Sequence, residues 1–66
     1  MNQIKINTII VDDNKELCNI LNEYLSMQGD IVVTGIANDG LEALKLIQEK
    51  KPNLVILDMI SKNGGY

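Results

Sequence analysis

Histidine is absent from this sequence of 66 residues, and Cys18 is its single cysteine. One cysteine cannot form an intramolecular disulfide, and without histidine there is no Cys/His set to bind zinc. Two common means of stabilising a small domain are therefore excluded. Below about 70–80 residues a single hydrophobic core rarely supplies comfortable stability, so association with another chain is expected. We interpret Cys18 as a small filler in a helix rather than a redox thiol.

Aromatic residues and positive charge are also scarce. Tyr24 and Tyr66 are the only aromatic residues, and the formal net charge at pH 7 is −3. Because there is no basic stripe or stacking platform, direct binding of nucleic acid is not expected. No apolar run approaches the ~18 residues that span a bilayer, and no signal-peptide pattern opens the chain. We expect one small cytoplasmic domain over residues 1–66, with a frayed tail at 61–66.

Three segments are predicted to be strands, at residues 4–11, 31–37 and 54–57. The apolar run of the first is nearly continuous, and the third is wholly apolar. This pattern is typical of strands that are covered on both faces in a parallel sheet. Gly35 interrupts the second strand and indicates a bulge or a close approach of another part of the chain.

Two amphipathic helices are predicted between these strands. The expected apolar face of the first consists of Leu17, Ile20, Leu21, Tyr24 and Leu25. That of the second consists of Leu41, Ala43, Leu44 and Ile47.

The ends of both helices also have sequence signals. Asp13 followed by Glu16 fits a capping box for the first helix, and Gly29 is placed to end it. Asp39 is expected to cap the second helix. The segment Lys50-Lys51-Pro52 should terminate that helix, with the lysines complementing its dipole.

The resulting order is β-α-β-α-β, and crossovers of this length imply a parallel α/β sheet with right-handed connections. If the helices lie on opposite faces, the fold is doubly wound with strand order 2-1-3. Ligands of such folds bind outside the carboxyl ends of the first and third strands. Asp12, Asp13 and Asp58 are predicted to lie there.

Three carboxylates at adjacent strand ends repel one another unless a cation or a proton relieves the repulsion. Magnesium takes oxygen ligands and commonly binds through one or two carboxylates and a phosphate, which matches a site of three acids, so Asp12, Asp13 and Asp58 are the predicted metal ligands. Such a metal brings a phosphoryl donor to a carboxylate nucleophile, for which Asp58 is the candidate. Taken singly, each acid has a simpler interpretation as a polar cap of a strand or helix end.

Three segments resemble the response-regulator receiver domain. They are Ile9-Ile10-Val11-Asp12-Asp13-Asn14, Asn38-Asp39-Gly40-Leu41-Glu42-Ala43-Leu44 and Pro52-Asn53-Leu54-Val55-Ile56-Leu57-Asp58-Met59. All three segments occur in the order and at the spacing expected for that family. Within the family, Asp-Asp-Asn-Lys-Glu-Leu and Glu-Tyr-Leu are most similar to the receiver of the sporulation master regulators of endospore-forming Firmicutes.

The resemblance implies a phosphoacceptor module of bacterial two-component or phosphorelay signalling, not an enzyme with turnover. It implies that Asp12 and Asp13 bind Mg²⁺ and that Asp58 accepts the phosphoryl group from a histidine kinase or phosphotransferase. It also implies a metal ligand in the backbone carbonyl of Ile60. In family members Met-Pro usually follows the phosphoacceptor, whereas Met59 is followed here by Ile60 and Ser61.

The resemblance covers residues 1–60 or so, about half of a family domain, and implies a truncated flavodoxin-like fold. The family's phosphoryl-binding Lys and Ser/Thr have no counterpart, so we expect weak or short-lived phosphorylation without the normal switch. The apolar third strand would then have an unpaired edge, which is a template for pairing with another chain. We expect a homodimer through that edge or through uncovered sheet faces.

Two other functions remain open. The first is an interaction fragment that associates with itself and has no phosphoryl chemistry. The second is a small phosphatase or nucleotide enzyme. Against the second, Asp12 lacks an aspartate two residues later, and no Gly-x-Gly-x-x-Gly follows the first strand.

Overall fold

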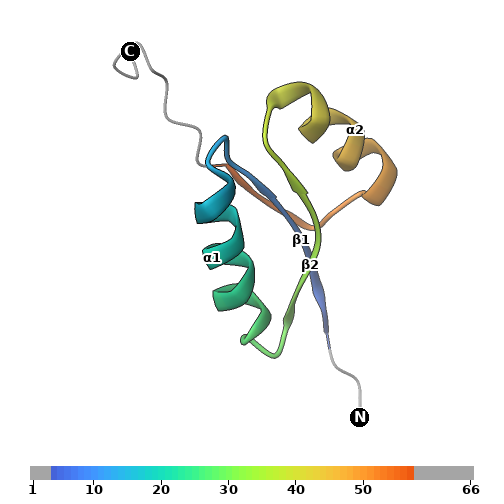
Figure 1. Cartoon of the computed structure of the whole chain (residues 1–66). Helices are drawn as coiled ribbons and strands as arrows, with labels where there is room; N and C mark the ends of the chain where they lie inside the picture. Colours follow the sequence, from blue (N-terminus) through green and yellow to red (C-terminus); the bar gives the residue numbers. More distant parts are fainter. Residues whose placement is uncertain (1–3, 58–66) are drawn as a thin grey trace.

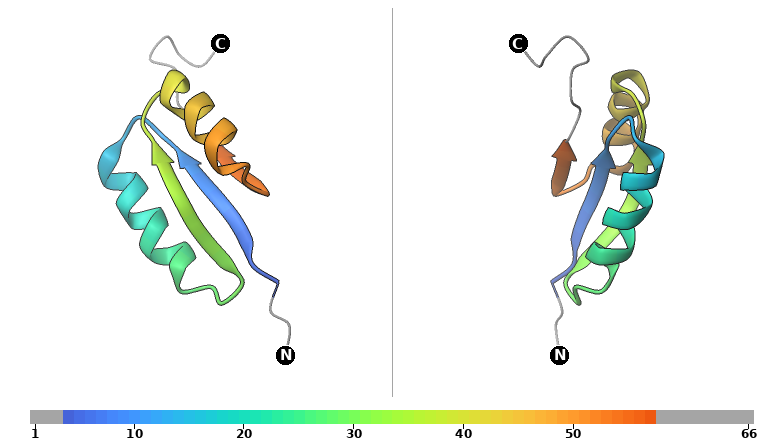
Figure 2. Two further views of the ribbon diagram at one scale, coloured as in Figure 1. Left: turned by 90° about the vertical axis from the view of Figure 1, so that its right-hand side faces the viewer. Right: turned by 60° about the vertical axis from the view of Figure 1, so that its left-hand side comes forward.

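The computed structural model describes residues 4–57, in which three strands alternate with two helices. In chain order these are β1 (Ile6–Val11), α1 (Lys15–Ser26), β2 (Ile31–Ala37), α2 (Gly40–Lys50) and β3 (Leu54–Leu57). All strand pairs are parallel and the sheet order is β2-β1-β3. The helices lie on opposite sides of the sheet (Figures 1 and 2). The predicted doubly wound α/β arrangement is confirmed.

The hydrophobic core is divided by β1 into two parts. Because successive side chains of a strand point to opposite faces, Ile9 and Val11 face α2 and Ile10 faces α1. On the α2 side they pack with Ala37, Ala43, Leu46 and Ile47. On the α1 side Ile10 packs with Cys18, Leu21, Leu25, Ile31, Val33, Ile36 and Ile56. The nearly continuous apolar run of β1 therefore reflects burial on both faces.

Gly35 has both of the roles predicted for it. The β1–β2 register shifts between Thr8 and Ile9, so that Ile9 pairs with Gly35 and Thr34 is the extra residue. A Cβ atom at Gly35 would lie 3.2 Å from Cδ1 of Leu46. The absence of a side chain here lets α2 approach β2 closely.

The prediction that the third strand is buried on both faces is wrong for the described part of the chain. Leu54 is 43% exposed and Leu57 68% exposed. The physical reason is that both helices pack against β1 and β2, whereas β3 is the outer strand and pairs only with β1. Of its residues, only Ile56 joins one of the two core clusters.

The predicted apolar faces of the helices need correction. In α1, Ile20 and Tyr24 are exposed, and Cys18 is buried beside the sheet instead. In α2, Leu41 and Leu44 are exposed, and Leu46 packs against the core in their place. Each helix contains more apolar positions than its contact with the sheet can cover, so packing against the sheet selects the buried stripe.

The first helix begins and ends differently from the prediction. Its N-cap is Asn14, whose side chain accepts a hydrogen bond from the Leu17 amide (3.1 Å). Asp13 is not the cap, because the helix starts one residue later. At the other end Met27 keeps a right-handed helical conformation as the C-cap, so Gly29 is not the residue that ends the helix.

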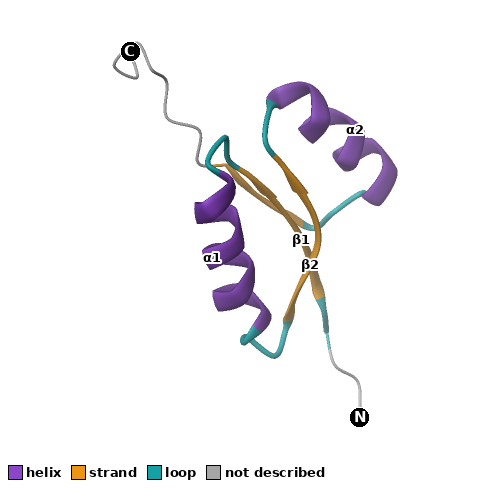
Figure 3. Cartoon of the chain, in the orientation of Figure 1, coloured by secondary structure: helices purple, strands orange, loops and turns teal. Residues whose placement is uncertain are grey.

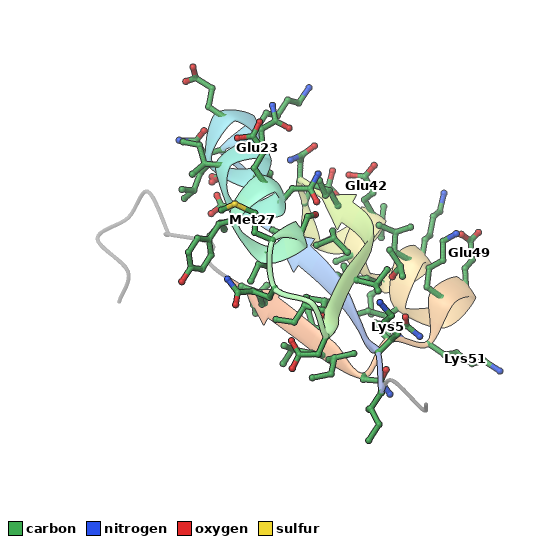
Figure 4. The ribbon with its side chains drawn as sticks, turned by 90° about the horizontal axis from the view of Figure 1, so that it is seen from below. Lys5, Glu23, Met27, Glu42, Glu49 and Lys51 are labelled. Atoms are coloured by element: carbon green, nitrogen blue, oxygen red, sulfur yellow. The ribbon has the colours of Figure 1, made fainter. Side chains whose placement is uncertain are left out.

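The ends of the second helix agree with the prediction. The Asp39 side chain accepts a hydrogen bond from the Glu42 amide (2.8 Å). Lys51 is the C-cap and adopts a left-handed conformation with φ of 47°. Its side chain extends away from the ribbon (Figure 4), and Pro52 follows, which favours a sharp stop.

Candidate functional site

The loops after β1 and β2 lie at the same end of the sheet (Figure 3). Asp12 is the first residue after β1, and it is only 2% exposed. Asp13, the next residue, is exposed to solvent. The predicted acidic pair is therefore at the carboxyl end of the central strand, with one acid buried and the other free to reach into solvent.

Hydrogen bonds hold both the backbone N–H and the backbone carbonyl of Asp12. Its N–H donates to the carbonyl of Ala37 (3.0 Å), which continues the β1–β2 ladder by one bond. Its carbonyl accepts a hydrogen bond from the side-chain amide of Asn38 (2.9 Å). The Cys18 thiol donates to the same carbonyl (3.4 Å). Asp12 is thus fixed by residues from β2, the loop after it, and α1.

The two carboxylate oxygens of Asp12 have different environments. Oδ1 accepts a hydrogen bond from the backbone N–H of Asn14 (2.9 Å). Oδ2 is buried and has no hydrogen-bond partner among the described residues. A buried polar atom without a partner is costly, and a buried charge more so. A bound cation would relieve that cost, so the arrangement fits a hard divalent ion with oxygen ligands such as Mg²⁺.

Two of the predicted site residues, Asp58 and Ile60, lie outside the described residues. Among the described residues, the last pair of the β1–β3 ladder is Val11 with Leu57. Within residues 4–57 no group of three or more His, Cys, Asp or Glu side chains gathers as a metal site. The roles of Asp12, Asp13, Asp58 and Ile60 therefore stay predictions.

Cys18 is a buried neighbour of the acidic pair. Burial raises the pKa of its thiol above the ordinary value of 9.0, and the negative charge of Asp12 raises it further. The thiol therefore stays protonated near neutral pH and keeps its donor for the Asp12 carbonyl. This agrees with the interpretation of Cys18 as a packing residue.

Asn38 also contacts the site, although the sequence places it only in a segment that resembles the receiver domain and assigns it no role of its own. Besides the Asp12 carbonyl, its amide donates to Sγ of Cys18 (3.6 Å). The predicted topology contained a signal that could have found it. Asn38 directly follows β2, and the carboxyl ends of parallel neighbours meet at one edge of the sheet.

One comparison with known proteins identifies a family. Residues 8–63, well over half of the chain, match the family model of the response regulator receiver domain. The matched range includes all four predicted site positions. Within the described part of the chain, none of the helices has the length and apolar character needed to cross a membrane.

Proposed function

This chain belongs to the response regulator receiver domain family, and from that premise we propose that Asp58 is its phosphoacceptor. Membership implies a phosphoacceptor role in two-component signalling, with a histidine kinase or phosphotransferase as donor. Receiver domains generally bind Mg²⁺ at an acidic pocket, for which Asp12 and Asp13 are the candidates here, with the Ile60 carbonyl as a further ligand.

The observation that supports the metal site of this proposal is the buried Oδ2 of Asp12, which has no hydrogen-bond partner within residues 4–57. Every other polar atom of that residue is held in place: the N–H by Ala37, the carbonyl by Asn38 and Cys18, and Oδ1 by Asn14. One oxygen is therefore left in a fixed position for a ligand. Asp13, which is exposed, supplies a second carboxylate at the mouth of the site.

The reaction that we propose is a direct transfer. A carboxylate oxygen of Asp58 attacks the phosphorus of the donor, the O–P bond to Asp58 forms, and the P–N bond to the donor histidine breaks. The departing histidine nitrogen takes a proton from solvent. Asp12 and Asp13 would hold Mg²⁺, which would supply positive charge to balance the phosphoryl oxygens and the carboxylates. Each chain accepts one phosphoryl group, so the protein acts as an acceptor without turnover.

We also propose that the 66-residue chain by itself is phosphorylated slowly and holds the group briefly. Within residues 4–57 no donor, lysine included, reaches Oδ2 of Asp12. At this oxygen a bound metal ion would then supply the positive charge.

The test is intact-mass analysis after incubation with acetyl phosphate and Mg²⁺. We expect the parent to gain the mass of one phosphoryl group, partially and reversibly, and Asp58→Asn to gain none. Omission of Mg²⁺ or the substitution Asp12→Asn should suppress the adduct. An adduct of equal yield in Asp58→Asn would show that another residue is the acceptor, and no adduct in folded parent protein would overturn the proposal.

A sporulation phosphorelay is the specific context that we propose, on the strength of the segments at residues 12–17 and 23–25. The location would be the cytoplasm, where kinases draw on ATP. The test compares transfer to Asp58 from the phosphorylated phosphotransferase of a sporulation relay with transfer from a kinase of an unrelated two-component pair. Faster transfer from the unrelated kinase would contradict the assignment.

The exposed outer strand supports a second candidate, a self-associating interaction module. Val55 is 36% exposed and Leu57 68%, and within the described residues the far edge of β3 has no strand beside it. We propose a homodimer through this edge. Light scattering at micromolar concentration should give twice the monomer mass. Val55→Lys should yield monomer because charge blocks edge pairing, whereas Leu44→Lys, at an exposed position of α2, should not.

A further inference from the structure

Asn38 links three parts of the fold at the acidic end of the sheet. It follows β2, and its side chain is partly buried. Its amide nitrogen donates to the carbonyl of Asp12 at 2.9 Å and to Sγ of Cys18 at 3.6 Å. Its backbone N–H donates to Oε1 of Glu42 (2.9 Å). The residue is therefore anchored to α2 through its main chain while its side chain reaches β1 and α1.

The hydrogen bond from the Asn38 side chain to the Asp12 carbonyl lies at the point where the β1–β2 hydrogen-bond ladder ends. The Asp12 N–H still bonds to Ala37, the last residue of β2. Beyond Ala37 the chain turns toward α2, so no further residue of β2 is available to donate to the Asp12 carbonyl. The Asn38 amide takes the place of that backbone donor.

This hydrogen bond fixes more than the position of the Asp12 carbonyl. The carbonyl of Asp12 belongs to the peptide unit that joins Asp12 to Asp13, and a peptide unit is planar. Holding its oxygen therefore fixes the rotation of the backbone between the two acidic residues. The relative direction of the two carboxylates depends on that rotation, whereas the hydrogen bonds of Asn38 go to neither carboxylate.

We propose that Asn38 is a positioning residue for the metal site at Asp12 and Asp13. The inference rests on the proposed function, because it assumes that these acids bind Mg²⁺. Partners that orient metal ligands commonly change metal affinity by about 10–100-fold when they are substituted. Asparagine suits the position because its NH₂ group donates, whereas an aspartate there would add a negative charge beside the Asp12 carbonyl and the acidic pair.

A matched control stands at the opposite end of the sheet. Asn53 also bridges two segments. Its side-chain Oδ1 accepts a hydrogen bond from the backbone N–H of Asn7 (3.0 Å), and its backbone N–H donates to the backbone carbonyl of Asn7 (2.8 Å). Asn53→Ala therefore removes a side-chain amide that joins distant parts of the chain without touching the acidic pair. A merely structural role of Asn38 would make the two alanine variants behave alike.

The experiment titrates Mg²⁺ into the full 66-residue chain and follows the backbone amide of Asn14 by NMR, since that amide bonds to Asp12 Oδ1. Circular dichroism verifies that each variant is folded at the temperature used. We expect Asn38→Ala to weaken Mg²⁺ binding about tenfold, Asn38→Asp to weaken it further, and Asn53→Ala to leave it unchanged.

A second readout needs no metal. With EDTA present, hydrogen exchange of the Asn14 amide should be about fivefold faster in Asn38→Ala, because loss of one net hydrogen bond loosens the Asp12 carboxylate. Asn53→Ala should leave the local exchange rate of this amide at the parent value.

Two negative outcomes are distinguishable. If Asp12→Asn abolishes Mg²⁺ binding while Asn38→Ala binds Mg²⁺ as tightly as Asn53→Ala does, the inference about Asn38 is overturned and the proposed site stands. If Asp12→Asn still binds Mg²⁺ like the parent, the proposed metal site itself is wrong and the inference falls with it. Equal Asn14 exchange in the two alanine variants also overturns the positioning role.

Discussion

Replacing Asp12 by asparagine should stabilise the metal-free protein. The residue is 2% exposed, and one of its carboxylate oxygens has no partner among the described residues. Asparagine keeps the shape of the side chain and the acceptor for the Asn14 amide, and it removes the buried charge. A buried unsatisfied polar group costs about 1–3 kcal/mol, and a charged one costs more. A neutral amide in the same place retains part of that cost.

The expected gain in the free energy of unfolding is therefore about 1 kcal/mol in EDTA, at the low end of the range for such groups. For a domain of this size that corresponds to an increase in Tm of about 4–8 °C. Magnesium should reverse the ranking. At ten times its Kd a ligand of the folded state adds about 1.4 kcal/mol to the parent, and the variant should gain nothing.

Thermal denaturation followed by circular dichroism, in EDTA and in Mg²⁺, measures both effects. In EDTA, Asp13→Asn is the matched control, because Asp13 is exposed and a surface substitution shifts stability by less than about 0.5 kcal/mol. If Asp12→Asn melts below the parent in EDTA, the carboxylate stabilises the fold and the reasoning from Oδ2 fails. Equal stabilisation of parent and variant by Mg²⁺ would refute the assignment of the metal to Asp12.

Three further predictions concern the scaffold. Asp39→Ala should lower the free energy of unfolding by about 1 kcal/mol, measured by urea denaturation, because it removes the side-chain acceptor of the Glu42 amide. Gly35→Val should lower it more than Gly35→Ala does, because even a Cβ would lie 3.2 Å from Leu46; equal losses would show that α2 simply moves away. Cys18 should resist a thiol reagent at pH 8 in the folded protein, and modification at the rate of the unfolded chain would contradict its burial. Since its pKa is raised on folding, its contribution to stability is complete below pH 9.0 and declines as pH rises through the higher folded pKa.

The sequence alone determined the kind and order of the elements. The β-branched run of β1, the apolar run at Leu54–Leu57 and the turn signals at Asp39 and Pro52 are local, and the structure has strands and helix ends at those places. Strand order 2-1-3 followed from the rule for right-handed crossovers on the condition that the helices lie on opposite faces of the sheet, and the structure meets that condition (Figure 2). The same rule put Asp12 at the carboxyl end of the central strand, and the motifs identified the receiver family that residues 8–63 match.

Only the tertiary structure decided which side chains are buried and which groups surround the Asp12 carboxylate. Periodicity marked Ile20 and Leu44 as core residues, but the sheet covers a narrower stripe, which buries Cys18 and packs the partly buried Leu46 against the core instead. Likewise, an apolar strand is covered only where a helix lies over it, and both helices pack on β1 and β2.

The hydrogen-bond partners of Asp12 were likewise decided by the tertiary structure and not by the local sequence. Its partner Asn38 lies 26 residues away in the sequence, and no local pattern connects the two. They meet because β1 and β2 are adjacent and end at the same edge of the sheet. Helix periods and turn residues are properties of neighbouring positions along the chain, whereas burial and hydrogen bonding at the site depend on which distant segments the fold brings together.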